Sequence, residues 1–388
     1  MRHALAVVLL VVAVGGAIAR PWRLPAWVAP TVAAVVALAA RTLTIHEART
    51  ALHPLAEPLL FVALAVPLAV MLDAVGIFEE LAGQAARSRR VVGACWILAA
   101  TVVAVLNLDA AVVLLTPIYV RTARQVGVEP AMLAFQPVLL AMLASSVLPV
   151  SNLTNLVVAS RLSLTTTDFL AHLAGASLVA SLAGWFAFRR VFPAHATAAS
   201  AGSVRALDRR ALTVGGGAIA VFLVLLVGGE HLGVPAWAAA LGAIVVLAAA
   251  GGALPWRHVP LGTIVLAAAL VVVASGAALA YPHVLTSAGD GGVRGFAAGV
   301  VSGNLLNNLP ATIVALPHVT RTSRVWPLLL GLNAGPSLLL TGSLAGLLWQ
   351  ASASAAGVHV SAREFTRVGV LVGVPAMAAG FVALQLFR

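Results

Sequence analysis

Two stretches of this 388-residue chain are similar: Asn107-Leu-Asp-Ala-Ala-Val-Val-Leu-Leu-Thr-Pro117 and Asn307-Asn-Leu-Pro-Ala-Thr-Ile-Val-Ala-Leu-Pro317. They lie 200 residues apart, and Asn, Ala and Pro coincide at the first, fifth and eleventh positions. Each stretch forms the polar centre of an apolar run, 91–120 or 295–319, that is too long for one crossing of a bilayer. Both runs therefore predict re-entrant hairpins, and together they predict an internal repeat.

The composition places the rest of the chain in lipid. Hydrophobic residues make up 61% of it and charged residues only 9%, against about 25% charged in an ordinary soluble domain. The mean hydropathy is +1.05. These values exclude a soluble enzyme and a nucleic-acid-binding protein, although the net charge is +11. The single cysteine, Cys95, excludes a disulfide framework and a site with several thiolates.

Apolar runs of about 17 residues or more between the arginines predict membrane crossings. We expect an all-α polytopic membrane protein with about ten transmembrane helices and the two re-entrant hairpins. The expected crossings are 4–19, 26–40, 59–78, 131–158, 169–188, 211–228, 236–251, 261–281, 326–349 and 366–386. The first run also resembles a signal peptide ending at Ala17-Ile18-Ala19. We favour a transmembrane helix, because removing it would spoil the repeat.

The order of elements divides the chain into two similar halves. Each half has three crossings, a hairpin, a crossing broken by polar residues and a final crossing. Five crossings is an odd number, so the halves are predicted to be inverted-topology repeats, an architecture of secondary transporters. The expected boundaries are 1–190 for the first repeat, 191–210 for a cytoplasmic linker and 211–388 for the second repeat.

The arginines predict the orientation, because basic loops prefer the cytoplasm. Arg87, Arg89 and Arg90 precede the first hairpin, and Arg121 and Arg124 follow it, so both ends of this hairpin are expected inside. Both termini are then extracytoplasmic. Arg321 and Arg324, beside the second hairpin, are exceptions to the rule in this orientation.

Polar residues interrupt two crossings as well as the two hairpins. The crossing 131–158 is broken at 149–155, and the crossing 326–349 is broken at 333–337 and again at 341–343. Unwound backbone inside a membrane is tolerated only where protein or a water-filled cavity satisfies its polar groups. The four breaks therefore predict one site near the midplane.

Amide and hydroxyl side chains collect at these breaks and predict a site that binds a small polar solute rather than a catalytic one. They both donate and accept hydrogen bonds, and half-helix N-termini beside them add partial positive charge. The alternative is that they only satisfy broken backbone or join helices. The candidates are Asn107, Asp109, Ser151, Asn152, Thr154, Asn155, Asn304, Asn307, Asn308, Asn333, Thr341 and Ser343.

Asp109 is the candidate for proton coupling. A carboxylate in the membrane costs at least about 2.5–3.5 kcal/mol and usually marks an ion or proton path. The alternative is a helix cap, since Asp109 precedes the apolar run 110–115. Asp73, near the end of its helix, is assigned a structural role. Gly295, Gly299 and Gly303 share one helical face and are expected to let the limbs of the second hairpin pack closely.

No nucleotide-binding or hydrolase motif is present in the sequence, and no metal or cofactor site is predicted. The expected partners are lipid, a small inorganic solute and a coupling proton or sodium ion. The sequence leaves open a homodimer and a separate cytoplasmic ATPase.

Four motifs resemble the arsenite permeases (arsenical pump membrane proteins) of the ion transporter superfamily, which also includes divalent anion/sodium symporters. The motifs are Val105–Pro117, Ser151–Val158, Ser302–Pro310 and Gly335–Trp349. This resemblance implies alternating access and proton-coupled export of arsenite or antimonite across the inner or plasma membrane. It assigns the hairpin tips to Asn107, Asp109, Asn307 and Asn308, and the helix breaks to 151–155 and 336–343.

Two features depart from that family. The chain is short, and Asn-Leu-Asp replaces the adjacent Asn-Asp pair of some members. We therefore keep two alternatives on the same fold: a sodium- or proton-coupled carrier of an inorganic or organic anion, and a sodium/proton antiporter. A different class, a membrane protein that only binds or senses a partner, would carry no flux.

Overall fold

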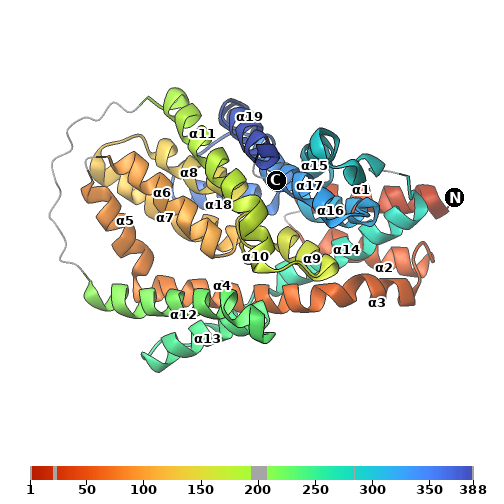
Figure 1. The fold of residues 1–388 in the computed structure, drawn as a ribbon, viewed down its shortest axis with the longest axis horizontal. Coiled ribbons are helices and arrows are strands. Elements are labelled where there is room, and N and C mark those ends of the chain that lie inside the picture. The colour runs from red at the N-terminus through yellow and green to blue at the C-terminus, as the bar shows by residue number, and fades with distance from the viewer. Residues whose placement is uncertain (1, 21–23, 89, 194–207, 284, 387–388) are drawn as a thin grey trace.

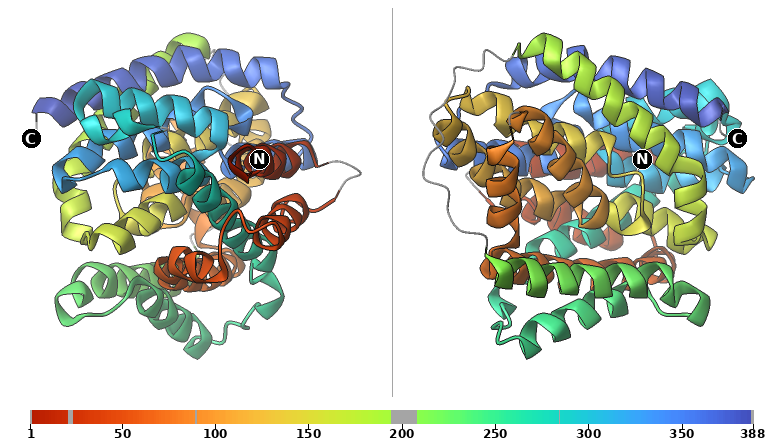
Figure 2. Two further views of the ribbon diagram at one scale, coloured as in Figure 1. Left: turned by 90° about the vertical axis from the view of Figure 1, so that its right-hand side faces the viewer. Right: turned by 60° about the vertical axis from the view of Figure 1, so that its left-hand side comes forward.

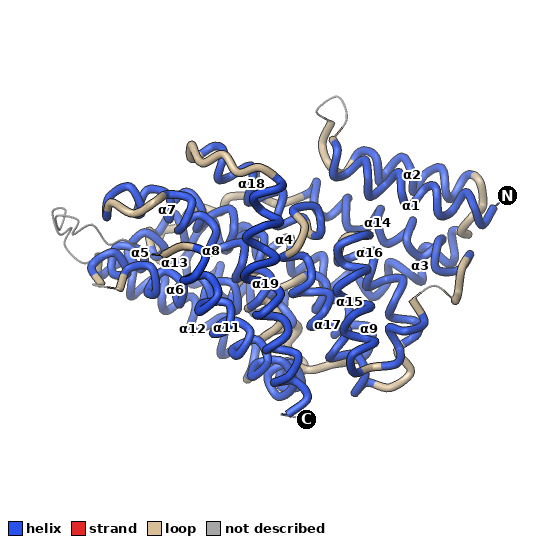
Figure 3. The backbone as a smooth tube through the Cα atoms, turned by 90° about the horizontal axis from the view of Figure 1, so that it is seen from above, coloured by secondary structure: helices blue, strands red, loops and turns tan. Residues whose placement is uncertain are grey.

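The structure, a computed structural model, describes residues 2–20, 24–88, 90–193, 208–283 and 285–386. The described residues are helical or irregular, with no strand among them (Figure 3). Arg23, Arg89, Arg205 and most of the predicted linker lie outside the described residues. The prediction of an all-α polytopic membrane protein is confirmed at this level.

Nineteen α-helices follow one another in the described chain. The first ten are α1 (Arg2–Ala19), α2 (Val28–Ala39), α3 (Ile45–Leu52), α4 (Ala56–Val75), α5 (Ile77–Arg87), α6 (Val91–Val105), α7 (Leu108–Val126), α8 (Pro130–Leu143), α9 (Leu153–Leu162) and α10 (Thr166–Phe169). The others are α11 (Gly175–Val191), α12 (Gly216–Val227), α13 (Ala236–Ala249), α14 (Leu261–Ala280), α15 (Gly292–Leu306), α16 (Asn308–Ala315), α17 (Val325–Ala334), α18 (Leu344–Ala355) and α19 (Ala362–Leu386).

Five stretches of the described chain are long and apolar enough to cross a bilayer as continuous helices. They are Arg2–Ala19, Ile45–Val75, Thr166–Val191, Trp256–Ala280 and Ala362–Leu386. Other apolar helices, such as α2 and α13, are shorter than 18 residues. The predicted total of ten crossings stays a prediction.

Large apolar side chains cover the outside of several helices. Val11 of α1 is 61% exposed, Val35 of α2 60%, Phe186 of α11 62% and Val224 of α12 68%. So many exposed aliphatic and aromatic groups would be unfavourable in water, whereas lipid solvates them.

Two outer helix pairs pack against the opposite half of the sequence. α1 and α2 pack on α14, and α12 and α13 pair with each other while α13 packs along α4. Figures 1 and 2 show α12 and α13 beside α4 at one edge of the molecule. Figure 3 shows α1 and α2 beside α14 at another edge. The first two helices of each half therefore form a pair that packs against a helix of the other half.

The two helical hairpins lie where the repeated motif predicts them. α6 and α7 form the first, joined at Leu106 and Asn107, and α15 and α16 form the second, joined at Asn307 alone. In Figure 1 the α6–α7 hairpin lies in the left half of the molecule and the α15–α16 hairpin in the right half. The first hairpin extends beyond the predicted 91–120, because α7 continues to Val126.

Both predicted broken helices are broken, but the boundaries differ. α8 ends at Leu143 and α9 begins at Leu153, so the first break starts before the predicted 149–155 and ends before Thr154. α17 extends through Ala334, so Asn333 lies in its last turn rather than in the break, which covers 335–343. Asparagine occurs both in the last turn of a helix and just beyond it, so an asparagine alone does not show where the helix ends.

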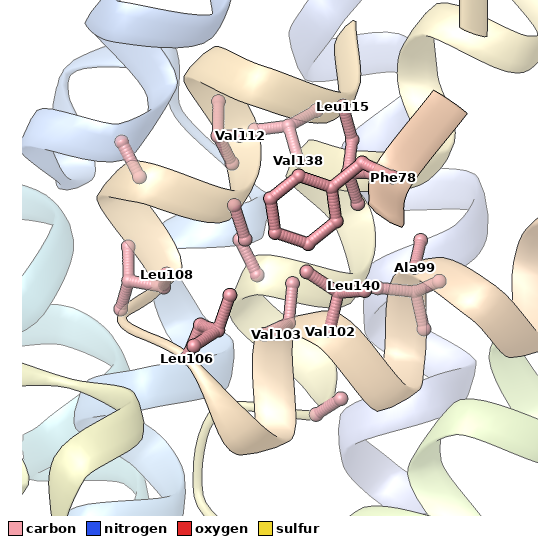
Figure 4. Close-up of a cluster of buried hydrophobic side chains, with 14 of the residues drawn as sticks. Phe78, Ala99, Val102, Val103, Leu106, Leu108, Val112, Leu115, Val138 and Leu140 are labelled. Atoms are coloured by element: carbon pink, nitrogen blue, oxygen red, sulfur yellow. The ribbon is translucent and has the colours of Figure 1, made fainter. Parts of the chain in front are cut away.

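The first hairpin is fixed by an apolar core (Figure 4). The ring of Phe78, on α5, lies among side chains of α6, α7 and α8, including Val102, Val112 and Val138. Phe78 is 1% exposed. Close packing of this core therefore fixes the position of the hairpin tip.

Gly299 and Gly303 of α15 face α17, and Gly295 faces the Ala288 carbonyl, so the expectation that these glycines pack against the second limb of the hairpin was wrong. A Cβ on Gly299 would collide with the Leu328 carbonyl of α17, and one on Gly303 would lie 3.5 Å from the Leu332 carbonyl. Gly331 on α17 faces Gly299 in return. Small residues at a helix crossing allow backbones to approach closely, but spacing alone does not say which helix approaches.

We predict that Gly331→Ala lowers the melting temperature of the detergent-solubilised protein. The new Cβ would collide with the Phe296 carbonyl and lie 3.0 Å from the Val300 nitrogen, and such overpacking costs about 1–3 kcal/mol. Gly217→Ala is the matched control, because a Cβ there meets nothing within 4 Å. Equal melting temperatures for the two variants would contradict the close α15–α17 contact.

Candidate functional site

Four helices begin around one cavity, and they come from the two hairpins and the two broken helices. These are α7, α9, α16 and α18, and α1 and α14 supply the facing wall. The lining residues are Val14, Ala17, Ile18, Ala26, Leu108, Asp109, Asn152, Leu153, Thr154, Thr263, Leu266, Ala267, Leu270, Asn307, Asn308, Leu309, Ser343, Leu344, Ala345 and Leu347. The four helix starts thus come from both halves of the chain.

The cavity is small. Its volume is about 70 Å³. By the same measure one water needs about 10–15 Å³. The space therefore fits a solute of a few heavy atoms or a small group of waters.

Each of the four helix starts contributes partial positive charge. The first N–H groups of an α-helix have no partner within the helix, and the helix dipole adds about half a unit charge at that end. Four such ends around one cavity favour a solute that presents oxygen lone pairs.

Two of the four N-termini are capped by their own side chains. The Asn107 side chain accepts a hydrogen bond from the Asp109 backbone N–H at 2.9 Å. The Asn152 side chain accepts one from the Thr154 backbone N–H at 3.0 Å. These caps fix the starts of α7 and α9, which are both in the first half.

The two N-termini of the second half lack such a cap. Neither Asn307, before α16, nor Ser343, before α18, accepts a capping hydrogen bond. The Asn308 side chain instead accepts from the next backbone N–H, that of Leu309, at 3.0 Å. The second half therefore presents more free donors to the cavity.

Asn307 has a backbone conformation that favours glycine. Its φ is 71° and its ψ is 151°, and it alone connects α15 to α16. Such a conformation costs about 1–3 kcal/mol in a residue with a side chain and persists only where the surroundings impose it. This sharp turn places both Asn307 and Asn308 in the cavity lining.

Asp109 is the one ionisable residue among the described residues that line the cavity. It lies in the first turn of α7, and it has no ion pair within the described part of the chain. The described lining residues include no arginine or histidine. The helix N-termini are therefore the nearest compensating charge for its carboxyl group.

Two hydroxyl groups at the cavity have no partner in the described structure. Thr154 Oγ1 and Ser343 Oγ are buried and make no hydrogen bond there. Buried polar atoms are rarely left unsatisfied, and an orphan atom in a native structure requires an explanation. Both residues line the cavity, so a bound solute or water can satisfy them.

A network of amides lies behind the cavity and joins the two halves. Asn152 Nδ2 donates to Asn333 Oδ1 at 2.9 Å, and Asn333 Nδ2 donates to Asn155 Oδ1 at 2.7 Å and to Ser146 Oγ at 3.0 Å. Asn155 Nδ2 in turn donates to the Ser145 and Leu148 carbonyls of the first break. This network holds α9 against α17.

The other predicted site residues support backbone or lie outside the lining. Ser151 Oγ donates to the Ala104 carbonyl of α6, and Asn304 Nδ2 donates to the Val300 and Gly335 carbonyls. Thr341 does not line the cavity. These contacts show that Ser151 and Asn304 provide hydrogen bonds to backbone carbonyl groups.

The facing wall of α1 and α14 was not predicted. Thr263 is the polar side chain of this wall, and it lies in the first turn of a largely apolar helix. A hydroxyl side chain in a largely apolar span was the available signal. The remaining wall residues are aliphatic, and nothing in the sequence distinguishes them from the aliphatic residues of the other membrane helices.

A bundle of apolar helices, in which four helices begin around a cavity with amide, hydroxyl and carboxyl groups in its lining, is an arrangement found in membrane transporters. Residues 6–357 match the model of the citrate transporter family (CitMHS), and the chain belongs to that family.

Curated relatives agree with the resemblance to arsenite permeases. The chain is 28% identical over 367 residues to the arsenical pump membrane protein of Escherichia coli (strain K12), which covers 84% of this chain and 85% of the relative. The proteins of that name from Shigella flexneri and Yersinia enterocolitica are 28% and 27% identical over the same shares. The predicted resemblance is confirmed.

We predict that Asn333→Ala destabilises the protein strongly. It removes the Asn333 partner of Asn152 Nδ2, Asn155 Oδ1 and Ser146 Oγ, and each buried group left unsatisfied costs about 1–3 kcal/mol. The melting temperature in detergent measures this effect. Gln350→Ala, which removes one half-buried hydrogen bond to Val360, is the control. A smaller shift for Asn333→Ala than for Gln350→Ala would contradict the role of the network.

Proposed function

We propose that this protein is a secondary active transporter that exports arsenite or antimonite in exchange for protons. The observation that supports this proposal best is the cavity itself. Neutral amide and hydroxyl groups, four helix N-termini and one carboxyl group surround a space for a few heavy atoms.

Arsenous acid matches this chemistry. Near neutral pH it is a small, largely uncharged triol, so its hydroxyl groups both donate and accept hydrogen bonds. Asn308, Thr154 and Ser343 offer groups of both kinds at the cavity. A site with three thiolates is excluded because the chain has one cysteine, Cys95, which is buried in α6.

The coupling proton is assigned to Asp109. If its carboxyl group takes up a proton on one side of the membrane and releases it on the other, export draws on the proton gradient. Each charge moved through the potential contributes about 2.3 kcal/mol per 100 mV. The alternative role for Asp109 was the N-cap of α7. Asn107 is that N-cap, because its side chain accepts a hydrogen bond from the Asp109 backbone N–H, so the Asp109 carboxyl group is free to carry the proton.

The two halves are proposed to be inverted repeats, 1–190 and 211–388, joined by the cytoplasmic linker 191–210. The support is the order of described elements: a hairpin, a broken helix and a final long helix occur in each half. Opposite orientation of the halves would provide alternating access to one central site. We place the protein in the inner or plasma membrane. A homodimer and a separate cytoplasmic ATPase stay predictions.

A second candidate function is transport of a citrate-like anion, which the description of the family favours. Positive side chains would favour binding of such an anion, and among the described lining residues there is none. Its carboxylates would also face Asp109. Helix N-termini alone can bind anions, so transport of such an anion is retained as an alternative to arsenite export. Sodium/proton exchange is retained as a further alternative, and the experiment distinguishes them.

The test is transport into everted membrane vesicles energised by respiration. Arsenite should accumulate, and an uncoupler should abolish the accumulation. Sodium-dependent citrate uptake that arsenite does not affect would favour the second candidate. Absence of flux for every solute in proteoliposomes would contradict a transporter of either kind.

We predict that Asp109→Asn abolishes the dependence of arsenite uptake on the pH gradient while arsenite binding is retained. The amide keeps the shape of the side chain and can still form hydrogen bonds, but it cannot take up and release a proton. Uptake at several imposed pH gradients measures this. Asp290→Asn is the control, since Asp290 is exposed and pairs with Arg294 at 3.5 Å. Unchanged coupling in Asp109→Asn would remove Asp109 from the mechanism.

We predict that Thr154→Val and Ser343→Ala raise the KM for arsenite by up to about tenfold, since one hydrogen bond contributes about 0.5–1.5 kcal/mol. Neither should lower the melting temperature, because both hydroxyls lack a partner within the described protein. Ser177→Ala, which removes an orphan hydroxyl in α11 away from the cavity, is the matched control. An unchanged KM in both site variants would place the solute elsewhere.

A further inference from the structure

One face of α7 carries an exposed strip that begins at the candidate site. Asp109, Val113, Pro117 and Arg121 follow one another every four residues and so share this face, and Arg124 continues it. At 1.5 Å per residue, the strip runs about 18 Å from Asp109 to Arg121.

A second cavity of about 370 Å³ lies along this strip. α7 lines most of it, and Asp73 of α4, Glu79 of α5 and Ala356, just after α18, complete it. Asp109 lines the first cavity and Val113, one turn further along α7, lines the second. The two cavities thus follow each other along one helix face.

The exposure of α7 is restricted to this face. Val113 is 39% exposed, whereas Val112 and Leu115, on other faces, are each 0% exposed. Tyr119 is also 0% exposed. One side of α7 therefore packs into the core, and the other side borders open space.

The open face becomes polar away from Asp109. Arg121 donates to Glu79 at 2.6 Å, and Arg124 donates to the Ala356 carbonyl at 2.8 Å. Pro117 has no backbone N–H, so it removes the donor that would otherwise bond the Val113 carbonyl four residues earlier. A carbonyl without this helical partner can accept from water in the middle of the strip.

We propose that this strip is the wall of a water-filled passage through which the coupling proton moves between Asp109 and the end of the molecule where α7 terminates. The role of the proton rests on the proposed function, whereas the presence of water does not. The charged groups of the passage are Asp73, Glu79, Arg121 and Arg124. None of the other described elements around Asp109, which are α1, α9, α14, α16 and α18, adds a charged group to its cavity.

Lipid is the alternative occupant, because an exposed valine in a membrane protein often faces acyl chains. Cysteine labelling separates the two, since a thiol reacts as the thiolate, which forms readily only in water. The native Cys95 is 0% exposed and gives a low background. Ile97 of α6, 68% exposed and without a place in either cavity lining, provides a lipid-facing control.

The experiment labels Val113→Cys and Leu114→Cys with a charged, membrane-impermeant thiosulfonate in everted and right-side-out vesicles. Both variants should react at least about tenfold faster than Val112→Cys and Ile97→Cys, because only a hydrated thiol ionises. Reaction should occur from the side to which Arg121 and Arg124 are exposed. Rates equal to that of Ile97→Cys for both variants would overturn the proposal.

A second measurement tests the proton route. Labelled Val113→Cys should lose pH-dependent arsenite uptake and keep arsenite binding, whereas the unlabelled variant should keep both. Full pH dependence after complete labelling would show that the proton takes another path. Labelling itself requires no transport, so its outcome stands even if the protein carries no arsenite.

Discussion

Backbone N–H groups that begin a helix inside the membrane must find hydrogen-bond partners, and the centre of this protein depends on that constraint. Lipid supplies none, so a helix can start at this depth only beside protein groups or a polar cavity. Here four helices do so together, at α7, α9, α16 and α18. The cavity is thus a consequence of ending and restarting helices in an apolar bundle, and the proposed solute site uses the same groups.

The two halves meet this constraint differently. In the first half Asn107 and Asn152 cap their own helices, while in the second half the N-termini at Asn307 and Ser343 are uncapped. Asn333 connects the halves through three side-chain hydrogen bonds. We propose that the capped half positions the solute and that the half with free donors binds it.

Sequence patterns predicted where helices begin and end better than which helices and side chains contact one another. Prolines and asparagines mark where helices stop, so the hairpin around Asn307 and the break before Thr154 could be predicted. Asn333 and Asn308 are the same residue type at similar breaks, yet one lies in the buried network and the other lines the cavity. That difference depends on tertiary packing. The α1 wall and the exposed Val113 face are apolar stretches whose neighbours no local pattern specifies.

The central claim is that the solute binds among oxygen and nitrogen donors at the four helix starts. X-ray absorption at the antimony edge of the protein with bound antimonite, combined with the anomalous signal in a crystal, tests it directly. The account predicts antimony between Asp109, Asn308 and Ser343 with oxygen or nitrogen neighbours only. Antimony bonded to the sulfur of Cys95, or located away from these helix starts, would contradict it.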